Sequence, residues 1–158
     1  MQNRIRRLND ARVRTDGRYV LYWAQMNRRT ESNHALARAI DLGNELNLPV
    51  LCYEGLTCSY DYASDRLHTF LLEGVPETER RLQAAGIGYC FHLRRRTADP
   101  DDILYRLAED ASCVVTDDYP TFIATRHNAR VPPRVRVRYE AVDSSCIVPM
   151  ALFSKREY

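Results

Sequence analysis

The sequence predicts a doubly wound α/β fold, in which helices flank a five-stranded parallel sheet. Short apolar runs rich in β-branched and aromatic residues alternate with longer segments whose apolar residues recur every three or four positions. The chain has 158 residues, the usual length of one domain, and enough Leu, Val, Ile and Phe for one core. Strands that alternate with helices in this way form a parallel sheet with right-handed crossovers.

The first elements follow a basic leader, residues 1–18, which holds six Arg and two Asp. Residues 19–25 are too few for a helix and are apolar on both faces, as in a central parallel strand. An amphipathic pattern then predicts a helix that Ser32 or Asn33 caps. Residues 48–54 are the second predicted strand, and a polar loop follows them.

A proline interrupts the next helical pattern, which runs from Ser64 to Val75. Pro76 lacks an amide proton, and its ring clashes with the preceding turn, so we expect a kink or a break there. A break would let a new helix start at Pro76 and end at Gly86. Residues 87–93 are the third predicted strand.

The remaining pattern completes the βαβ series. A helix is predicted over residues 98–110, with Asp99 as its cap and Pro100 in its first turn. The last three elements are the fourth strand, a helix and an alternating strand suited to a sheet edge, at residues 112–117, 120–130 and 134–140.

Composition excludes several classes of protein. The five Cys have no paired CxxC spacing, and Cys52, Cys90 and Cys113 lie in apolar runs, which is typical of buried thiols in a cytoplasmic protein. The apolar runs are too short to cross a membrane. Neither metal-ligand spacing nor a GxSxG nucleophile motif is present, so we expect no metal and no catalytic residue.

Charge argues against a dedicated nucleic-acid-binding domain, because the net charge is only +2. The run Arg94, Arg95 and Arg96 could meet phosphate or DNA, but such a run is more often a solvated loop. The two common phosphate-binding glycine loops, GxGxxG and GxxxxGK[ST], are absent.

The ends of the first and fourth strands carry the best candidates for ligand contact. The first strand runs into Trp23, Gln25, Met26 and Arg28, which combine a stacking ring, polar groups and a guanidinium suited to a planar heteroaromatic ligand. Alternatively, Trp23 packs in the core and the arginine is solvated. Ligands of such sheets bind beyond the carboxyl ends of the strands, where the strand order reverses.

The fourth strand ends in Asp117 and Tyr119, and it is often the neighbour of the first strand across that reversal. The two loops would then share one crevice. Asp117 would either cap the next helix or contact the ligand. The predicted ligand-binding residues are therefore Trp23, Gln25, Met26, Arg28, Asp117 and Tyr119.

Residues 6–56, with "GRYVLYW" and "NHAL" in that order, resemble the amino-terminal domain of class II cyclobutane pyrimidine dimer DNA photolyases. The segments "RLHTFLLEG", "AGIGYCFHL" and "VVTDD" extend the resemblance along the chain. It implies a Rossmann-like α/β domain that, in many photolyases, holds an antenna chromophore such as a deazaflavin, a folate or a flavin. We carry that role only onto the six residues named above.

The resemblance also implies a larger helical domain, carboxyl-terminal to this one, that binds FAD and the damaged DNA. Residues 19–143 would then be the α/β domain, and residues 144–158 would begin the linker. The full-length enzyme would be a deoxyribodipyrimidine photo-lyase that repairs DNA in light, whereas this chain alone would be inactive. Without that partner, the apolar segment 146–153 would be disordered, fold back on the sheet or pack against a second copy in a homodimer. Alternatively, it is a sixth strand or tail that completes the core of this domain.

Two other functions stay open on the sequence alone. One is a scaffold domain without catalysis that packs on the helical domain. The other is a stand-alone α/β protein that binds a nucleotide or a flavin on helix amino termini, without a glycine loop.

Overall fold

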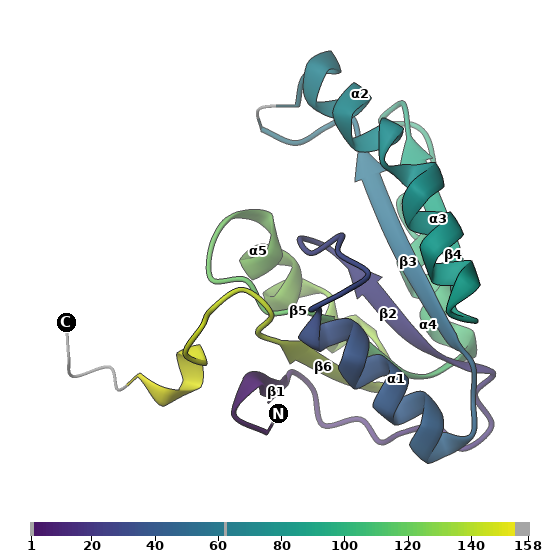
Figure 1. The fold of residues 1–158 in the computed structure, drawn as a ribbon, viewed down its shortest axis with the longest axis vertical. Coiled ribbons are helices and arrows are strands. Elements are labelled where there is room, and N and C mark those ends of the chain that lie inside the picture. Colours follow the sequence, from purple (N-terminus) through teal and green to yellow (C-terminus); the bar gives the residue numbers. More distant parts are fainter. Residues whose placement is uncertain (1, 62, 154–158) are drawn as a thin grey trace.

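Six strands form one sheet in the order β1-β6-β5-β2-β3-β4 (Figure 1). The computed structural model describes residues 2–61 and 63–153. The strands are β1 (Ile5–Arg7), β2 (Tyr19–Ala24), β3 (Val50–Thr57), β4 (Gly88–Arg94), β5 (Ala111–Asp117) and β6 (Arg138–Val142). The α-helices are α1 (His34–Leu46), α2 (Asp65–Glu73), α3 (Val75–Ala84), α4 (Ile103–Asp110) and α5 (Phe122–Arg130). Three short 3-10 helices are η1 (Gln2–Arg4), η2 (Pro132–Arg134) and η3 (Met150–Leu152).

The predicted parallel sheet of five strands is confirmed for β2 to β6, whose neighbours all pair in parallel. The prediction missed β1, which pairs with β6 in the antiparallel direction and makes the sheet mixed. This strand lies in the basic leader and is only three residues long, so it carries no alternating pattern. Only its contact with β6 makes it a strand.

That contact corrects the predicted edge strand over residues 134–140. The strand β6 begins at Arg138, and it is not at the edge because β1 covers it. Val135 and Val137 are buried before the strand begins. The backbone carbonyls of both accept hydrogen bonds from the side-chain amide of Asn9, at 3.2 and 2.9 Å, so they do not enter the sheet ladder.

Helices cover both faces of the sheet, as a doubly wound fold requires. On one face, α1 and Leu82 of α3 pack on a cluster that includes Val20 and Tyr22. On the other face, α4 packs on a cluster that includes Leu21 and Val114. Successive residues of β2 thus point into opposite cores, which explains why residues 19–25 are apolar throughout.

The helix boundaries confirm the expected break at Pro76. Helix α2 ends at Glu73, and α3 starts at Val75 with the proline in its first turn. The amino end of α1 is capped by Asn33, whose side chain accepts a hydrogen bond from the Leu36 amide at 3.0 Å. Gly86 has a φ of 73° where the chain leaves α3.

Two expectations about boundaries were wrong. Asp99 does not cap α4, which starts four residues later with Asp102 before it. Its carboxylate instead accepts hydrogen bonds from the amides of Arg95 and Arg96 and holds the preceding turn. The strand β3 also extends to Thr57, beyond the predicted residue 54, because β4 continues to pair with it there.

Two of the three cysteines expected to be buried are buried. Cys52 and Cys113 lie in the core, and burial raises the pKa of the Cys113 thiol to about 12. Cys90 is only partly buried, because β4 lies at the edge of the sheet. Among the described helices, none has the length and apolar character that a membrane span requires.

Candidate functional site

The strand order reverses between β2 and β5, which are adjacent and parallel as expected. Trp23 lies opposite Thr116 near the carboxyl ends of these strands. The loop after β2 and the loop after β5 therefore meet at the place where ligands of doubly wound sheets bind.

Asp117 joins the two loops through its carboxylate. One oxygen, Oδ2, accepts hydrogen bonds from the backbone amides of Gln25, Met26 and Asn27, at 2.8 to 3.0 Å. The other, Oδ1, accepts one from the Tyr22 hydroxyl at 3.0 Å. Only 3% of the residue is exposed. The carboxylate therefore fixes the β2 loop, and the cap of α5 is Thr121 instead.

The electrostatics of Asp117 reflect this position. Burial raises the pKa of its carboxyl group, whereas the amides of Met26 and Asn27 act in the opposite direction. Burial also raises the pKa of the neighbouring Tyr22 hydroxyl, and the Asp117 charge adds to that shift. The Tyr22 hydroxyl therefore stays protonated and can donate to the carboxylate.

Gln25 is the centre of a second network, which ties β5 to α5. Its side-chain nitrogen, Nε2, donates to Thr116 Oγ1 at 2.9 Å and to Asn128 Oδ1 at 3.1 Å. Its Oε1 can only accept, so Nδ1 of His127, 2.7 Å away, carries the proton of that hydrogen bond. The Trp23 ring lies 5.1 Å from the His127 ring, between centroids. Burial, with a smaller effect of Arg130, lowers the pKa of His127.

Arg28 connects the β2 loop to β3 and α2. Its Nε lies 2.6 Å from Glu54 Oε1, and its Nη1 donates to the Leu71 carbonyl at 2.8 Å. The Tyr89 hydroxyl donates to the other oxygen of Glu54 at 2.7 Å. Because no residue of α2 is buried, this arginine is a principal attachment of the helix to the sheet.

Two donors of this loop have no acceptor among the described residues. They are Nδ2 of Asn27 and Nη2 of Arg28. Asn27 is 8% exposed, and its Oδ1 accepts from the amide and Nε of Arg29. Buried donors without partners cost free energy, so an acceptor-bearing ligand here would be favoured. Asn27 was not among the predicted ligand-binding residues, although it lies between Met26 and Arg28.

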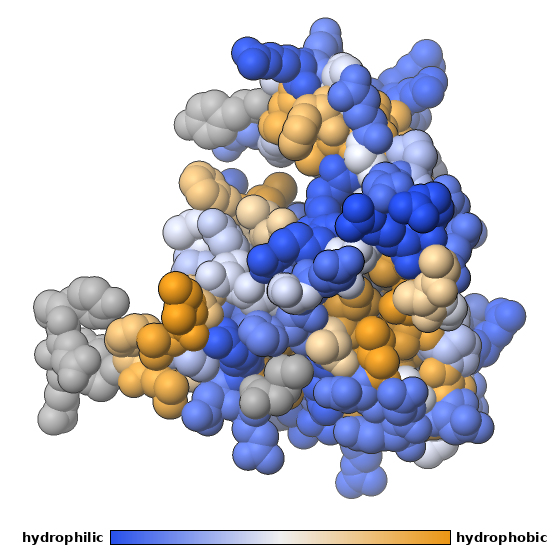
Figure 2. Space-filling model, viewed as in Figure 1, coloured by the Kyte–Doolittle hydropathy of each residue, from blue (hydrophilic) through white to orange (hydrophobic). Residues whose placement is uncertain are grey.

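The molecule is hollowed above these loops, between α2 and α5 (Figure 2). Exposed apolar side chains belong to the elements on either side: Leu67 and Phe70 of α2, and Phe122 and Ile123 of α5. Phe70 and Phe122 are 71% and 75% exposed, respectively. Met26, in the loop after β2, is 38% exposed. The two helices that flank this hollow therefore both carry exposed apolar side chains, which small-molecule sites commonly use.

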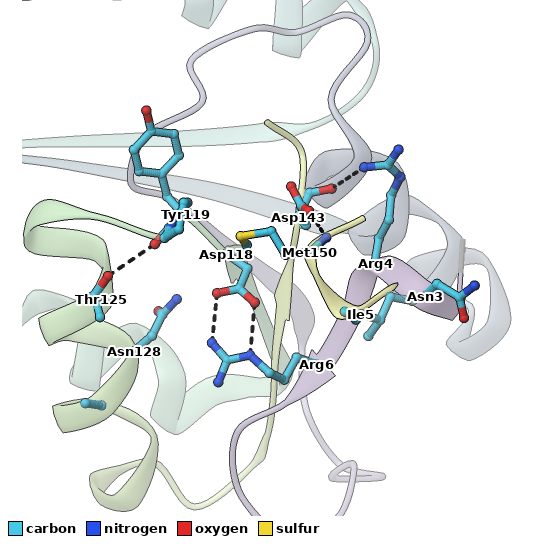
Figure 3. A pocket seen from close by; sticks show the side chains of 13 residues that line it. Asn3, Arg4, Ile5, Arg6, Asp118, Tyr119, Thr125, Asn128, Asp143 and Met150 are labelled. Atoms are coloured by element: carbon cyan, nitrogen blue, oxygen red, sulfur yellow. Dashed lines mark hydrogen bonds and ion pairs between the residues drawn. The ribbon is translucent and has the colours of Figure 1, made fainter. Parts of the chain in front are cut away.

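A separate pocket of about 450 Å³ lies beyond the ends of β5 and β6. Figure 3 shows Arg6 and Asp118 paired within it, with an Nη2 to Oδ1 distance of 2.8 Å. Arg4 lies at its rim and donates to the carbonyls of Asp143, Cys146 and Ile147, so it holds the carboxyl-terminal segment against the sheet. Tyr119 alone of the six predicted ligand residues lines this pocket.

The structure thus divides the six predicted residues by role. Trp23 and Asp117 are buried, whereas Gln25 is partly buried. Gln25 and Asp117 form hydrogen bonds within the protein, and Arg28 donates to a carbonyl of α2. Met26 and Tyr119 remain partly exposed at the strand ends. His127 was missed, because nothing in the helix pattern of residues 120–130 indicates that it contacts Gln25.

A doubly wound sheet with polar loops that meet at the strand-order reversal defines a Rossmann-like α/β domain. The profile of the DNA photolyase family matches residues 20–157. The chain therefore belongs to the DNA photolyase family, as an amino-terminal α/β domain.

Two curated photolyases are similar along most of the chain. The deoxyribodipyrimidine photo-lyase of Methanothermobacter thermautotrophicus is 32% identical over 154 residues, which are 98% of this chain and 34% of that protein. That of Arabidopsis thaliana is 30% identical over 142 residues, 88% of this chain and 28% of that protein. The chain spans about a third of the length of these relatives.

Solved structures support the fold alone. A universal stress protein from Archaeoglobus fulgidus has a TM-score of 0.52 and 16% identity, over 79% of this chain and 93% of that one. The universal stress protein from the same organism in complex with dAMP has a TM-score of 0.51 and 16% identity, over 79% and 98%.

Proposed function

We propose that this chain is the light-harvesting and structural domain of a deoxyribodipyrimidine photo-lyase, whose FAD and damaged DNA bind to a helical domain. The observation that carries the proposal is the family match over residues 20–157. Repair of a dimer requires the lesion to be taken out of the base stack and held beside the flavin. The described residues form one sheet with flanking helices. The proposal therefore assigns the binding of FAD and of the flipped lesion to the helical domain.

A chimera tests this proposal. The chain replaces the matching third of the M. thermautotrophicus photo-lyase, to which it is 32% identical. We expect the chimera to bind FAD and to reverse pyrimidine dimers in light but not in the dark. The isolated chain, given reduced FAD and light, should reverse none. Repair by the isolated chain, or a well-folded chimera that binds FAD and repairs nothing, would contradict the proposal.

The antenna chromophore is the finer part of the proposal. We place a deazaflavin, folate or flavin in the hollow between α2 and α5, above the ends of β2 and β5. The unpartnered donors of Asn27 and Arg28 fit a ring system that carries carbonyl acceptors. Met26 and Phe70 offer apolar surface to such a ring. Asp117, Gln25 and Trp23 would support the site from beneath rather than contact the ring.

Trp23 provides the measurement, because it is the chain's one tryptophan and lies near the carboxyl end of β2, where we place the ligand. A flavin, a deazaflavin and a folate are titrated separately into the chain, and we expect one of them to quench its fluorescence with saturation. Phe70→Ser and Met26→Glu should weaken that binding roughly tenfold, as the loss of ~1.4 kcal/mol of contact would. Ile147→Ser, in the carboxyl-terminal segment, should leave it unchanged.

Two outcomes would contradict the antenna site. If none of the three compounds quenches Trp23 at saturable concentrations, the domain is a scaffold without a chromophore. If Ile147→Ser weakens binding as much as Phe70→Ser does, the ligand binds elsewhere.

A further inference from the structure

Five exposed arginines lie where the leader crosses the end of α5 and the segment that follows it. They are Arg7, Arg12, Arg130, Arg134 and Arg136, and we call them the arginine patch. The patch adjoins the amino end of β6, whereas the proposed antenna site lies at the carboxyl ends of the strands. The two surfaces are therefore distinct.

Asn9 holds the two halves of the patch together. Its Nδ2 donates to the carbonyls of Pro132, Val135 and Val137, at 2.9 to 3.3 Å. Its Oδ1 accepts from the Tyr139 amide at 3.1 Å. Backbone hydrogen bonds join the same segments, from the Leu8 amide to the Tyr139 carbonyl and from the Arg138 amide to the Arg12 carbonyl. The leader is thus fastened to the segment 132–139, so the arginines on both segments belong to one surface.

Charge in this region is unbalanced. Residues 7–12 and 130–137 contain five Arg and one acidic residue, Asp10, which gives a local net charge of +4. The rest of the chain carries a net charge of −2. None of the five arginines forms an ion pair with a described residue. The overall charge of +2 therefore conceals a basic surface that only the fold assembles.

The chemistry of the patch indicates what it binds. The valines of this segment, Val131, Val135 and Val137, are all buried, so guanidinium groups rather than these side chains face the solvent. Two of the guanidinium groups also have protein partners: that of Arg7 donates to the carbonyls of Asn9 and Ala11, and that of Arg134 lies over the Tyr105 ring. Helices that lie in a membrane surface bury an apolar face there, and the buried valines of this segment provide no such face. Guanidinium groups bind phosphate through paired hydrogen bonds. A phosphate backbone is therefore the partner that this surface fits.

We propose that the arginine patch binds the backbone of duplex DNA without regard to sequence or damage. The choice of DNA among polyanions rests on the proposed function in DNA repair. A DNA contact on this domain, in addition to the one proposed for the helical domain, increases the effective concentration of DNA near the enzyme. Neither light nor flavin takes part in binding at the patch.

The test measures binding of the chain to a labelled, undamaged duplex of about 20 base pairs, by fluorescence anisotropy in the dark, at salt concentrations from about 50 to 200 mM. The patch variant combines Arg12→Glu, Arg130→Glu and Arg136→Glu. The control combines Arg66→Glu, Arg95→Glu and Arg96→Glu, which make the same change in net charge at exposed arginines outside the patch. Circular dichroism checks that both fold, and a variant with Gln at the three patch positions removes charge without reversing it.

We expect the patch variant to weaken binding at least tenfold at low salt, and the control by less than about threefold. The slope of log K against log salt should fall by about 2 to 3 in the patch variant, since each phosphate contact contributes roughly 0.9. Equal weakening in both variants would overturn the proposal, because bulk charge would then explain it. So would the absence of binding, or tighter binding to RNA or to phosphatidylserine vesicles than to the duplex.

These results separate the inference from the proposed function. If the chimera repairs dimers and the patch variant binds DNA normally, only the arginine patch is refuted. If the patch binds DNA and the chimera repairs nothing, only the assignment to light-driven repair is refuted.

Discussion

Asp117→Ala is expected to lower the free energy of unfolding by about 3 to 5 kcal/mol, the range for loss of a buried, charged hydrogen-bonding partner. The substitution leaves the amides of Gln25, Met26 and Asn27 and the Tyr22 hydroxyl without their acceptor. The β2 loop would lose its attachment to β5. Urea denaturation followed by circular dichroism measures the change.

The neighbouring residue is a matched control. Asp118→Ala removes a carboxylate whose one ion-pair partner, Arg6, has a side chain that is 58% exposed. We expect a loss of less than about 1 kcal/mol there, as for other surface pairs. Asp117→Asn should fall between the two alanine variants, because it keeps one acceptor oxygen. A loss below about 1 kcal/mol for Asp117→Ala would show that the loop is held by other contacts.

The pH dependence of stability, compared between the wild type and Asp117→Asn, adds a second readout. The folded-state pKa of Asp117 is raised by burial, so the native state binds this proton more tightly than the unfolded chain does. The stability that this proton contributes is present below the unfolded pKa and is lost as pH rises through the folded pKa. The stability of the wild type relative to Asp117→Asn should therefore decrease as pH rises through that window.

The second large effect concerns Glu140, which is fully buried in β6. Its carboxylate lies 2.9 Å from Nε of Arg38 in α1 and 2.5 Å from Nη2 of Arg138. We expect Arg38→Met to lower the free energy of unfolding by about 3 kcal/mol, because it leaves a buried carboxylate with one cation instead of two. Loss of this pair would also remove the ionic contact between α1 and β6.

A double-mutant cycle separates the ion pair from packing. Arg38→Met combined with Glu140→Leu should be less destabilised than the sum of the single variants by at least about 1 kcal/mol. Glu45→Ala, which removes the exposed second partner of Arg38, should cost less than about 0.5 kcal/mol. Strict additivity of the two single variants would mean that Arg38 stabilises the fold through its hydrocarbon stem alone.

The sequence was sufficient to predict the five parallel strands and the adjacency of β2 and β5 at the centre of the sheet. The runs at residues 19–25 and 112–117 are apolar on both faces, and that pattern is caused by burial between two helical layers. The break at Pro76 and the cap at Asn33 follow from covalent chemistry within one turn. Such features are local, so one sequence is sufficient to indicate them.

The sequence indicated where the candidate residues lie, and the tertiary structure shows which protein groups they contact. Trp23, Gln25 and Asp117 do lie at the strand-order reversal, yet they contact protein groups about 90 to 100 residues away in sequence. Those partners, such as His127 and Asn128, occupy a helix whose pattern gives no sign of them. Whether a polar side chain meets a ligand or a distant backbone amide depends on packing, which local periodicity does not report.

By itself, the sequence determined the class of fold and the family, because the alternation of apolar runs and the family's segments are properties of neighbouring residues. Only the tertiary structure decided that the leader supplies a sixth strand and that five arginines form one basic surface. Both depend on Asn9 and β1 contacting residues more than 120 positions away. The electrostatic potential at a surface is the sum of the contributions of all nearby charges. A basic surface built from distant segments therefore exists only once the chain has folded.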